Sequence, residues 1–267
     1  MYGYDVILKL VLCAFVSLLA VQWIFFRILK IAKIKHIEDV PDARKLQKEP
    51  TPVLGGIAVF FGLTIGLIFA SILFPETRNL LPVLLACTVM LYIGSIDDVL
   101  GISAGVRAII EALTILGLIY SSGMCIDSFH GLWGIHAFSW YLAVPLTVFI
   151  GVGLINAFNM VDGVNGLSST LCIVCSLLLG TIFYKMADPA DAALAFCFAG
   201  SLVVFTIHNI FGRKSCMFIG DGGTMVMGLL VTWFVIRIMS HQGLANNQMD
   251  AIGMNTIAML LAVVSVP

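Results

Sequence analysis

The stretch Tyr141-Leu-Ala-Val-Pro-Leu-Thr-Val-Phe-Ile-Gly-Val-Gly-Leu-Ile-Asn-Ala-Phe158 has no charged residue and leads directly into Asn159-Met-Val-Asp-Gly-Val-Asn-Gly-Leu167. About 20 predominantly apolar residues suffice to cross the hydrocarbon core of a bilayer as a helix. Ionisable groups inside or beside such a segment cost free energy, so those that occur usually serve a function. The pattern predicts a membrane-spanning helix over 141–158 that ends in a functional polar site.

The rest of the chain repeats this apolar pattern. Its 267 residues are 60% hydrophobic and 11% charged, whereas soluble domains carry about 25% charged residues. The composition therefore excludes a soluble globular protein, and the continuous runs lack the alternation of a membrane barrel. We expect an all-α, polytopic membrane helical bundle that forms a single domain over 1–267. The expected spans are 6–29, 53–74, 80–96, 106–121, 141–158, 166–184, 191–210, 225–240 and 253–267.

Lysine and arginine gather in alternate loops, which predicts the orientation of the bundle. Six basic residues lie in the segment 30–48 after the first span, and others follow the third and seventh spans. Because loops rich in Lys and Arg stay in the cytoplasm, we expect the N-terminus outside. The same alternation places Asp97, Asn159 and Asp221 together on the cytoplasmic face. Since only Lys and Arg fixed the orientation, this convergence of polar motifs is an independent result.

Two adjacent acids, Asp97 and Asp98, end the third expected span. Neighbouring helical side chains diverge by about 100°, so the two carboxylates can serve different partners. One could take a proton or face a metal while the other anchors a basic or backbone group. Arg107 could neutralise the pair or hold a phosphate. The alternatives are a solvated helix end for the acids and a topological anchor for Arg107.

Asn156, Asn159, Asp162 and Asn165 recur every three residues at the end of the fifth span. On a continuous helix they would form a polar stripe, which could simply hydrogen-bond to neighbouring helices. The glycines at 163 and 166 favour a loop that opens a pocket instead. Asparagine both donates and accepts hydrogen bonds, so these side chains could read a base edge or bind a metal.

Asp221 lies in the sequence Gly220-Asp-Gly-Gly223, before a helix that we expect to start near Thr224. Glycines and a helix start together provide backbone N–H groups for an anion. A carboxylate beside a bound phosphate suits Mg²⁺. The alternative is an aspartate that caps the helix.

Three basic residues, Arg44, Lys45 and Lys48, precede the sequence Pro50-Thr-Pro-Val-Leu-Gly-Gly56. This loop could receive an anionic substrate. Alternatively, its charge only fixes the topology or contacts lipid headgroups.

Taken together, four motifs resemble those of the polyprenyl-phosphate N-acetylhexosamine-1-phosphate transferase family. They are Pro52–Gly56, Asp97–Leu100 with Arg107, Asn156–Leu167 and Met217–Thr224, and they cover about 41–228 in order. Among its members, the chain most resembles the bacterial UDP-N-acetylglucosamine–undecaprenyl-phosphate transferases. The resemblance implies ten or eleven helices in the bacterial inner membrane, of which about nine are present. We therefore expect the C-terminal part of the protein to be missing from this sequence.

The resemblance also implies a reaction and a role for each motif. A sugar-1-phosphate would pass from a UDP-sugar to undecaprenyl phosphate, with release of UMP and with Mg²⁺, or Mn²⁺ in its place, as cofactor. The expected catalytic residues are Asp97 and Asp98, which match the pair proposed to activate the lipid phosphate, and Asp162, which matches the acid of an Asp-Gly motif. Asn159 and Asp221 match metal positions. The expected substrate contacts are Arg44, Lys45, Lys48, Arg107, Asn156, Gly163, Asn165 and Phe218, with Asn165 and Phe218 against uracil.

Two departures and two alternatives accompany this interpretation. Position 165 is Asn where many bacterial members have Asp, and the chain ends before a basic, histidine-containing loop of the family. The alternatives are a phospho-N-acetylmuramoyl-pentapeptide transferase and a transporter. A transporter would place polar residues near the bilayer midplane between repeats, whereas here they lie at one face.

Membrane lipids and a second copy of the chain, in a homodimer, are further expected partners. Nucleic acid is not an expected partner.

Overall fold

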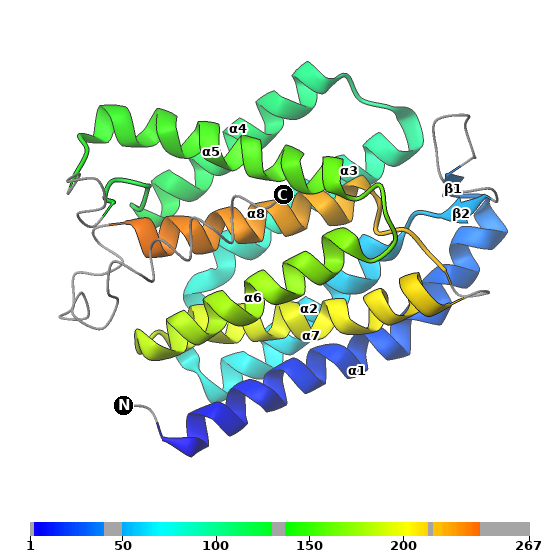
Figure 1. The fold of residues 1–267 in the computed structure, drawn as a ribbon, viewed down its shortest axis with the longest axis horizontal. Helices are drawn as coiled ribbons and strands as arrows, with labels where there is room; N and C mark the ends of the chain where they lie inside the picture. Colours follow the sequence, from blue (N-terminus) through cyan, green and yellow to red (C-terminus); the bar gives the residue numbers. More distant parts are fainter. Residues whose placement is uncertain (1–2, 40–49, 130–136, 213–215, 241–267) are drawn as a thin grey trace.

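Each of the first eight expected spans forms a helix in the computed structural model, which describes residues 3–39, 50–129, 137–212 and 216–240 (Figure 1). All eight are long and apolar enough to cross a membrane. The ninth expected span, 253–267, lies outside the described residues. The helices are α1 (Tyr4–Lys35), α2 (Gly55–Leu73), α3 (Leu81–Leu100), α4 (Ala104–Ser122), α5 (Trp140–Val161), α6 (Leu167–Lys185), α7 (Pro189–Phe211) and α8 (Gly220–Met239), with the 3₁₀ turn η1 (Pro75–Leu80) before α3. The prediction of a polytopic, all-α membrane bundle is confirmed.

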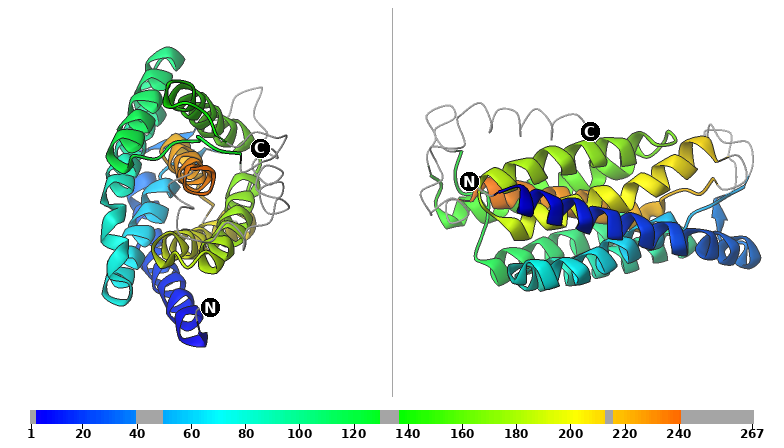
Figure 2. Two further views of the ribbon diagram at one scale, coloured as in Figure 1. Left: turned by 90° about the vertical axis from the view of Figure 1, so that its left-hand side faces the viewer. Right: turned by 90° about the horizontal axis from the view of Figure 1, so that it is seen from below.

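Helix α8 forms the centre of the bundle. Within its apolar window, 94% of the residues are buried inside the protein, and Figure 2 shows it enclosed by the other helices. It packs against α2, α3, α5 and α6. The contact with α3 is close because Gly94 has no side chain; a Cβ atom there would lie only 2.6 Å from the carbonyl carbon of Asp221. The helices with the least buried windows are α1 and α4, each with 22% of its window buried.

The start of α8 differs from the expectation. The helix begins at Gly220, whose φ of 75° is accessible to glycine at little cost, and not near Thr224. The sequence Gly220–Gly223 is therefore the first turn of a helix and not a separate glycine loop before it. The earlier start is supported by Asp98, which accepts a hydrogen bond from the N–H of Asp221 in this first turn.

A small antiparallel pair of strands, β1 (Glu38–Asp39) and β2 (Thr51–Pro52), lies at one end of the bundle. The chain before α8 adds to it, because Phe218 N–H donates to the Pro52 carbonyl at 2.7 Å. Gly55 and Gly56 then donate their N–H groups to the carbonyls of Phe218 and Ile219, at 2.9 and 2.7 Å. The motif Pro52–Gly56 thus holds the beginning of α8 in place.

The opposite end of α8 is held by charge. Arg237 pairs with both Asp188 and Asp191 at the beginning of α7. Trp233 donates its indole N–H to Asp191 at 2.7 Å. The sequence analysis did not anticipate this cluster, which joins the C-terminal part of α8 to the first turn of α7.

Candidate active site

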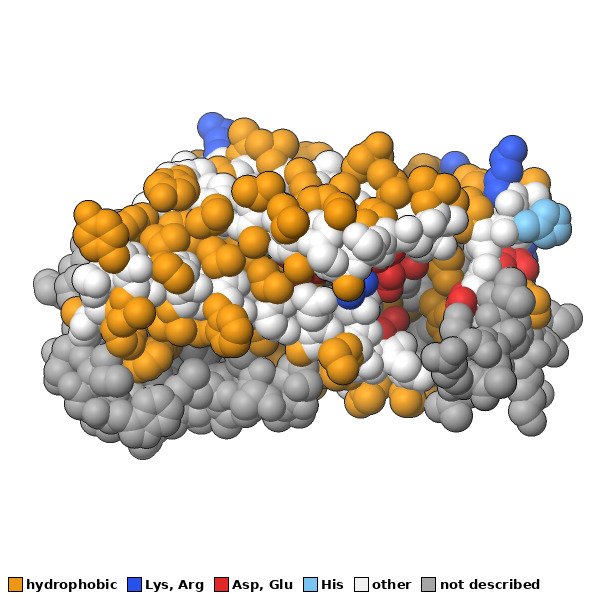
Figure 3. Space-filling model, turned by 90° about the horizontal axis from the view of Figure 1, so that it is seen from above, with side chains coloured by type: hydrophobic (Ala, Val, Ile, Leu, Met, Phe, Trp, Pro, Cys, Tyr) orange, Lys and Arg blue, Asp and Glu red, His pale blue; other side chains and the backbone are white. Residues whose placement is uncertain are grey.

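A pocket of about 890 Å³ opens at the end of the bundle that carries the two strands. The ends of α3 and α5, the beginning of α8 and the strand pair all contribute to its wall, so the predicted convergence of the polar motifs on one end is confirmed. Figure 3 shows acidic side chains in a hollow beside hydrophobic surface. The lining residues are Glu38, Asp39, Thr51, Val53, Asp98, Asn159, Asp162, Gly163, Val164, Asn165, Cys216, Phe218, Gly220 and Asp221.

The charge of this lining is one-sided. Five of the lining residues are acids, and none of those that the structure describes is a lysine or an arginine. Carboxylates that lie this close together repel one another unless a proton or a cation intervenes. An anionic substrate could enter only with positive charge supplied from elsewhere.

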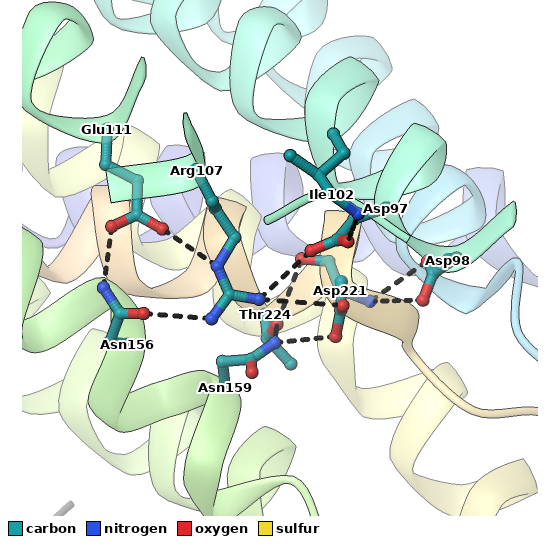
Figure 4. A network of polar contacts seen from close by, with 9 residues as sticks. All are labelled: Asp97, Asp98, Ile102, Arg107, Glu111, Asn156, Asn159, Asp221 and Thr224. Atoms are coloured by element: carbon teal, nitrogen blue, oxygen red, sulfur yellow. Dashed lines mark hydrogen bonds and ion pairs between the residues drawn. The ribbon is translucent and has the colours of Figure 1, made fainter. Parts of the chain in front are cut away.

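The acidic pair serves two different partners, as its helical spacing predicted. Asp97 is 8% exposed and accepts hydrogen bonds from the N–H of Ile102 at 2.6 Å and from Arg107 Nη1 at 3.1 Å. Asp98 instead turns toward the pocket and accepts the N–H of Asp221 (Figure 4). Only Asp98 of the two lines the pocket, so the two carboxylates are not equivalent.

Arg107 lies between the acids and α5. Besides its bond to Asp97, its guanidinium approaches Asp221 Oδ2 at 3.8 Å and Glu111 Oε1 at 3.6 Å. Its Nη2 donates to Asn156 Oδ1 at 3.1 Å. Arg107 therefore neutralises the acids around it, which is one of the three roles that its sequence position allowed.

Asn159 reaches from α5 to the first turn of α8. Its Nδ2 donates to Asp221 Oδ1 at 2.7 Å and to Thr224 Oγ1 at 3.0 Å. Thr224 is itself a donor to the Asp221 carbonyl at 3.0 Å, so its oxygen is free to accept. This fixes the amide of Asn159 and leaves its Oδ1 outside these bonds. An amide oxygen and a carboxylate thus stand together on the pocket wall.

The segment 162–166 leaves the helix, as Gly163 and Gly166 predicted. Asp162 caps the C-terminal end of α5 and accepts a hydrogen bond from Ser168. The pKa of the Asp162 carboxyl is raised to about 6, chiefly by burial and also by the charge of Asp221, while the Ser168 hydroxyl opposes the rise. Gly166 has a φ of 76°, which allows the turn into α6. Gly163 and Asn165 lie on the same pocket wall.

The structure thus brings six expected site residues to the pocket lining: Asp98, Asn159, Asp162, Gly163, Asn165 and Asp221. Phe218 is a seventh. Behind this lining lie Asp97, Arg107 and Asn156. Asp97 and Asn156 both contact Arg107, and Arg107 in turn approaches the lining residue Asp221. The expected contacts Arg44, Lys45 and Lys48 lie outside the described residues.

Several site residues were missed by the sequence analysis. Glu38 and Asp39 belong to a two-residue strand that has no signature in the sequence. Glu111 did carry a signal, because an acid within an apolar span and one turn from an arginine is unusual. Thr224 and Ser168 were also missed, since hydroxyl residues are common in helices.

Comparison with known proteins points in the same direction. The profile described as glycosyl transferase family 4 matches residues 80–239, which include all the motifs from α3 to α8. The undecaprenyl-phosphate alpha-N-acetylglucosaminyl 1-phosphate transferase of Yersinia pestis is 28% identical over 217 residues, covering 78% of this chain and 57% of that protein. The protein of that name from Escherichia coli K12 is 29% identical over 216 residues, with the same coverage.

A third relative covers a larger share of this chain. The probable undecaprenyl-phosphate N-acetylglucosaminyl 1-phosphate transferase of Bacillus subtilis is 29% identical over 238 residues, covering 89% of this chain and 64% of that protein. The chain thus spans somewhat more than half the length of the curated relatives that it matches. Because the family profile covers most of the chain, including the polar network at one end of the bundle, this multi-pass membrane protein belongs to glycosyl transferase family 4.

Proposed function

We propose that the protein transfers a sugar-1-phosphate, N-acetylhexosamine-1-phosphate, from a UDP-sugar to undecaprenyl phosphate. A non-bridging oxygen of the lipid phosphate attacks the β-phosphorus of the donor. The bond from this phosphorus to the oxygen that bridges to the α-phosphate breaks, and UMP leaves with that oxygen. The observation that supports this reaction best is the acidic pocket at one end of the helical bundle, in a chain whose relatives carry this activity in their names.

The donor set of the pocket fits a divalent cation. Mg²⁺ typically takes one or two protein carboxylates together with substrate phosphate oxygens. Asp221 and the amide oxygen of Asn159 could hold it, with Asp98 nearby. Among the described residues no group of three or more His, Cys, Asp or Glu forms a complete protein site, which agrees with an ion completed by substrate. When bound, the ion would neutralise the phosphates and polarise the phosphorus under attack.

The protein's own side chains mainly position and neutralise in this proposal. A lipid phosphate is already an anionic nucleophile at neutral pH, so the chemistry needs alignment and charge compensation more than a strong base. Asp98 would hold or accept a proton from the lipid phosphate at the pocket wall. Arg107 would add positive charge behind Asp221. Asn165 and Phe218, which share the wall, would contact the uracil ring of the donor.

The proposed reaction requires a particular orientation of the protein in the membrane. The Lys and Arg distribution supports a pocket on the cytoplasmic face of a bacterial inner membrane, where UDP-sugars are available. Single cysteines introduced near Asp39 and near Arg78, on opposite ends of the bundle, would be labelled with an impermeant thiol reagent in intact cells. We expect labelling at 78 only. Labelling at 39 would contradict the arrangement.

The decisive test is the reaction itself. Purified protein in undecaprenyl-phosphate-containing liposomes would be incubated with UDP-[¹⁴C]-N-acetylglucosamine and Mg²⁺. We expect a radioactive organic-soluble product and an equimolar amount of UMP. Uptake of intact UDP-sugar into the vesicles without UMP release would instead indicate a transporter. Products from a UDP-muramoyl-pentapeptide alone would indicate the pentapeptide transferase. The use of Mn²⁺ and a homodimer stay predictions.

A further inference from the structure

Glu111 is a completely buried acid in the interior of helix α4, with a side-chain exposure of 0%. A carboxylate at such a position costs free energy unless other groups compensate it. It lies one helical turn after Arg107 and does not line the pocket. The roles inferred from the sequence leave it without a function.

The Glu111 carboxylate forms a closed ring with two other side chains, Arg107 and Asn156. Asn156 Nδ2 donates to Glu111 Oε2 at 2.7 Å, and Asn156 Oδ1 accepts from Arg107 Nη2 at 3.1 Å. Arg107 Nε faces Glu111 Oε1 at 3.6 Å. Figure 4 shows the ring beside the acids of the pocket. Each of the three residues therefore contacts the other two.

The ring determines how the guanidinium is turned. Its Nη2 donates to Asn156 and its Nε faces Glu111 Oε1 in an ion pair at 3.6 Å, beyond hydrogen-bond distance. The remaining Nη1 points to Asp97 at 3.1 Å and toward Asp221 at 3.8 Å. The planar group offers donors in a fixed fork, which lets one side chain satisfy both sets of partners. A lysine at position 107 would have a single side-chain nitrogen and could not contact both sets of partners.

We propose that Glu111 is a positioning residue that acts through Arg107. It fixes the plane of the guanidinium, and thereby the placement of the positive charge relative to Asp97 and Asp221 during transfer. This inference rests on the proposed function for its effect on rate. The geometry of the ring can be tested without that function.

Glu111→Gln is the principal variant, because it removes the charge and keeps the shape. Arg107 retains Asp97 as a partner, so the fold should survive. A misplacement of about 1 Å can cost about 100-fold in rate. We expect kcat to fall about 10- to 100-fold, with KM for both substrates changed less than about twofold. Glu76→Gln makes the same chemical change at an exposed position in η1, the turn that precedes α3. This variant should change neither kcat nor KM.

A double-mutant cycle with Arg107→Lys distinguishes a positioning role of Glu111 from a general loss of structure. The effects of two mutations are not additive when one residue acts through the other. In the Arg107→Lys background, Glu111→Gln should cost less than about threefold. An equal cost in both backgrounds, or a loss of rate that matches a loss of folded protein, overturns the proposal. If Glu111→Gln does not fold, Asn156→Ser opens the same ring from α5 and takes its place, with the same expectation.

A spectroscopic measurement distinguishes failure of this inference from failure of the proposed function. If the unmodified protein and Glu76→Gln both form no lipid-linked product, the proposed function has failed. The Nε–H resonance of Arg107 in ¹⁵N-arginine-labelled protein, identified by its absence in Arg107→Lys, still reports on the ring. We expect Glu111→Gln to accelerate its exchange with water about tenfold or more, and Glu76→Gln to leave it unchanged. Unchanged exchange in Glu111→Gln overturns the inference.

Discussion

Asp98 and Asp221 are joined across 123 positions of sequence, because both carboxylate oxygens of Asp98 accept the backbone N–H of Asp221, at 3.0 and 3.1 Å. The N-terminus of a helix attracts anions through its free N–H groups and its dipole. In α8 a protein carboxylate already occupies part of this position. In the proposed reaction, a substrate phosphate would therefore meet Asp98 at the pocket wall and would share the helix terminus with it.

Asp98→Asn should lower turnover by about 10²- to 10⁴-fold, the usual contribution of a group that takes a proton or positions one. The asparagine oxygen can still accept the Asp221 N–H, so the fold should persist. Asp97→Asn should also lower turnover, but less, because Asp97 lies behind the pocket. Initial rates and detergent melting temperatures of both variants check this. Near-normal rates in both variants would show that the acidic pair is only a solvated helix end without a role in transfer.

Removal of divalent cations should abolish transfer, because the described pocket wall supplies five acids and no basic side chain for a diphosphate. Dialysis against a chelator, followed by Mg²⁺, should remove and restore activity, and Mn²⁺ should replace Mg²⁺. Asp221→Asn should raise the metal concentration needed for half-maximal rate, while Asp127→Asn, outside the pocket lining, should not. Full activity after thorough chelation would exclude the proposed ion.

Asp162 gives stability a pH dependence of known sign. Its pKa is raised to about 6 in the folded protein by burial, above the value of about 3.9 for an exposed aspartate. The folded protein thus holds this proton more tightly than the unfolded chain does. The contribution of Asp162 to the stability of the folded protein is therefore complete at a pH below the ordinary aspartate pKa. This contribution is lost as the pH rises through the raised pKa of the folded protein.

The melting temperature of the unmodified protein, minus that of Asp162→Asn, should therefore fall between pH 4 and pH 7. The asparagine variant is the reference because it carries no titrating group at this position and keeps an oxygen for Ser168. A difference that rises with pH, or stays constant, would show that burial does not govern this carboxyl.

Gly56→Ala tests the contact that places the start of α8. A Cβ at this position would lie 2.6 Å from the backbone nitrogen of Gly223, and backbone cannot turn aside. We expect a loss of about 1–3 kcal/mol or more, as for overpacked cores, together with reduced activity. Gly117→Ala is the matched control in α4, where nothing lies within 4 Å. It should be neutral or stabilising, since alanine favours a helix by about 1 kcal/mol over glycine.

Asn165→Ala should raise KM for the UDP-sugar and leave KM for undecaprenyl phosphate nearly unchanged. An amide on the pocket wall can pair with the N–H and C=O groups of uracil. Loss of such a bond costs about 1–3 kcal/mol, which corresponds to a rise of about 5- to 150-fold. Steady-state kinetics with each substrate varied in turn provide the measurement. A selective rise in KM for the lipid would assign Asn165 to the acceptor side instead.

The sequence predicted the helices well because long apolar runs have one stable solution in a bilayer, in which every backbone polar group is paired inside a helix. It also placed Asp98, Asn159 and Asp221 at one end, since helix direction alternates along the chain. Hydropathy could not predict where α8 begins. The Gly220 φ and the bond from Asp221 to Asp98 decide that point, and both depend on tertiary contacts.

The ring of Arg107, Glu111 and Asn156 was also beyond the sequence patterns. Arg107 and Asn156 were recognised singly, but their position behind the pocket lining depends on the rotation of α4 and α5 about their axes. Glu38 and Asp39 reach the pocket through the pairing of β1 with β2, which follows from the course of the chain and not from any local preference.

Helix α8 is fastened at both termini, by Asp98 at one and by the ion cluster of Arg237 at the other. Its apolar window is 94% buried, whereas those of α1 and α4 are 22% buried. Helices adapt to bilayer thickness by tilting or by deforming the lipid around them. We expect such adjustments to act first on α1 and α4, whose windows are the least buried. The position of Asp221 in the enclosed helix α8 should then change less with the acyl-chain length of the surrounding membrane than the position of Arg107 in α4.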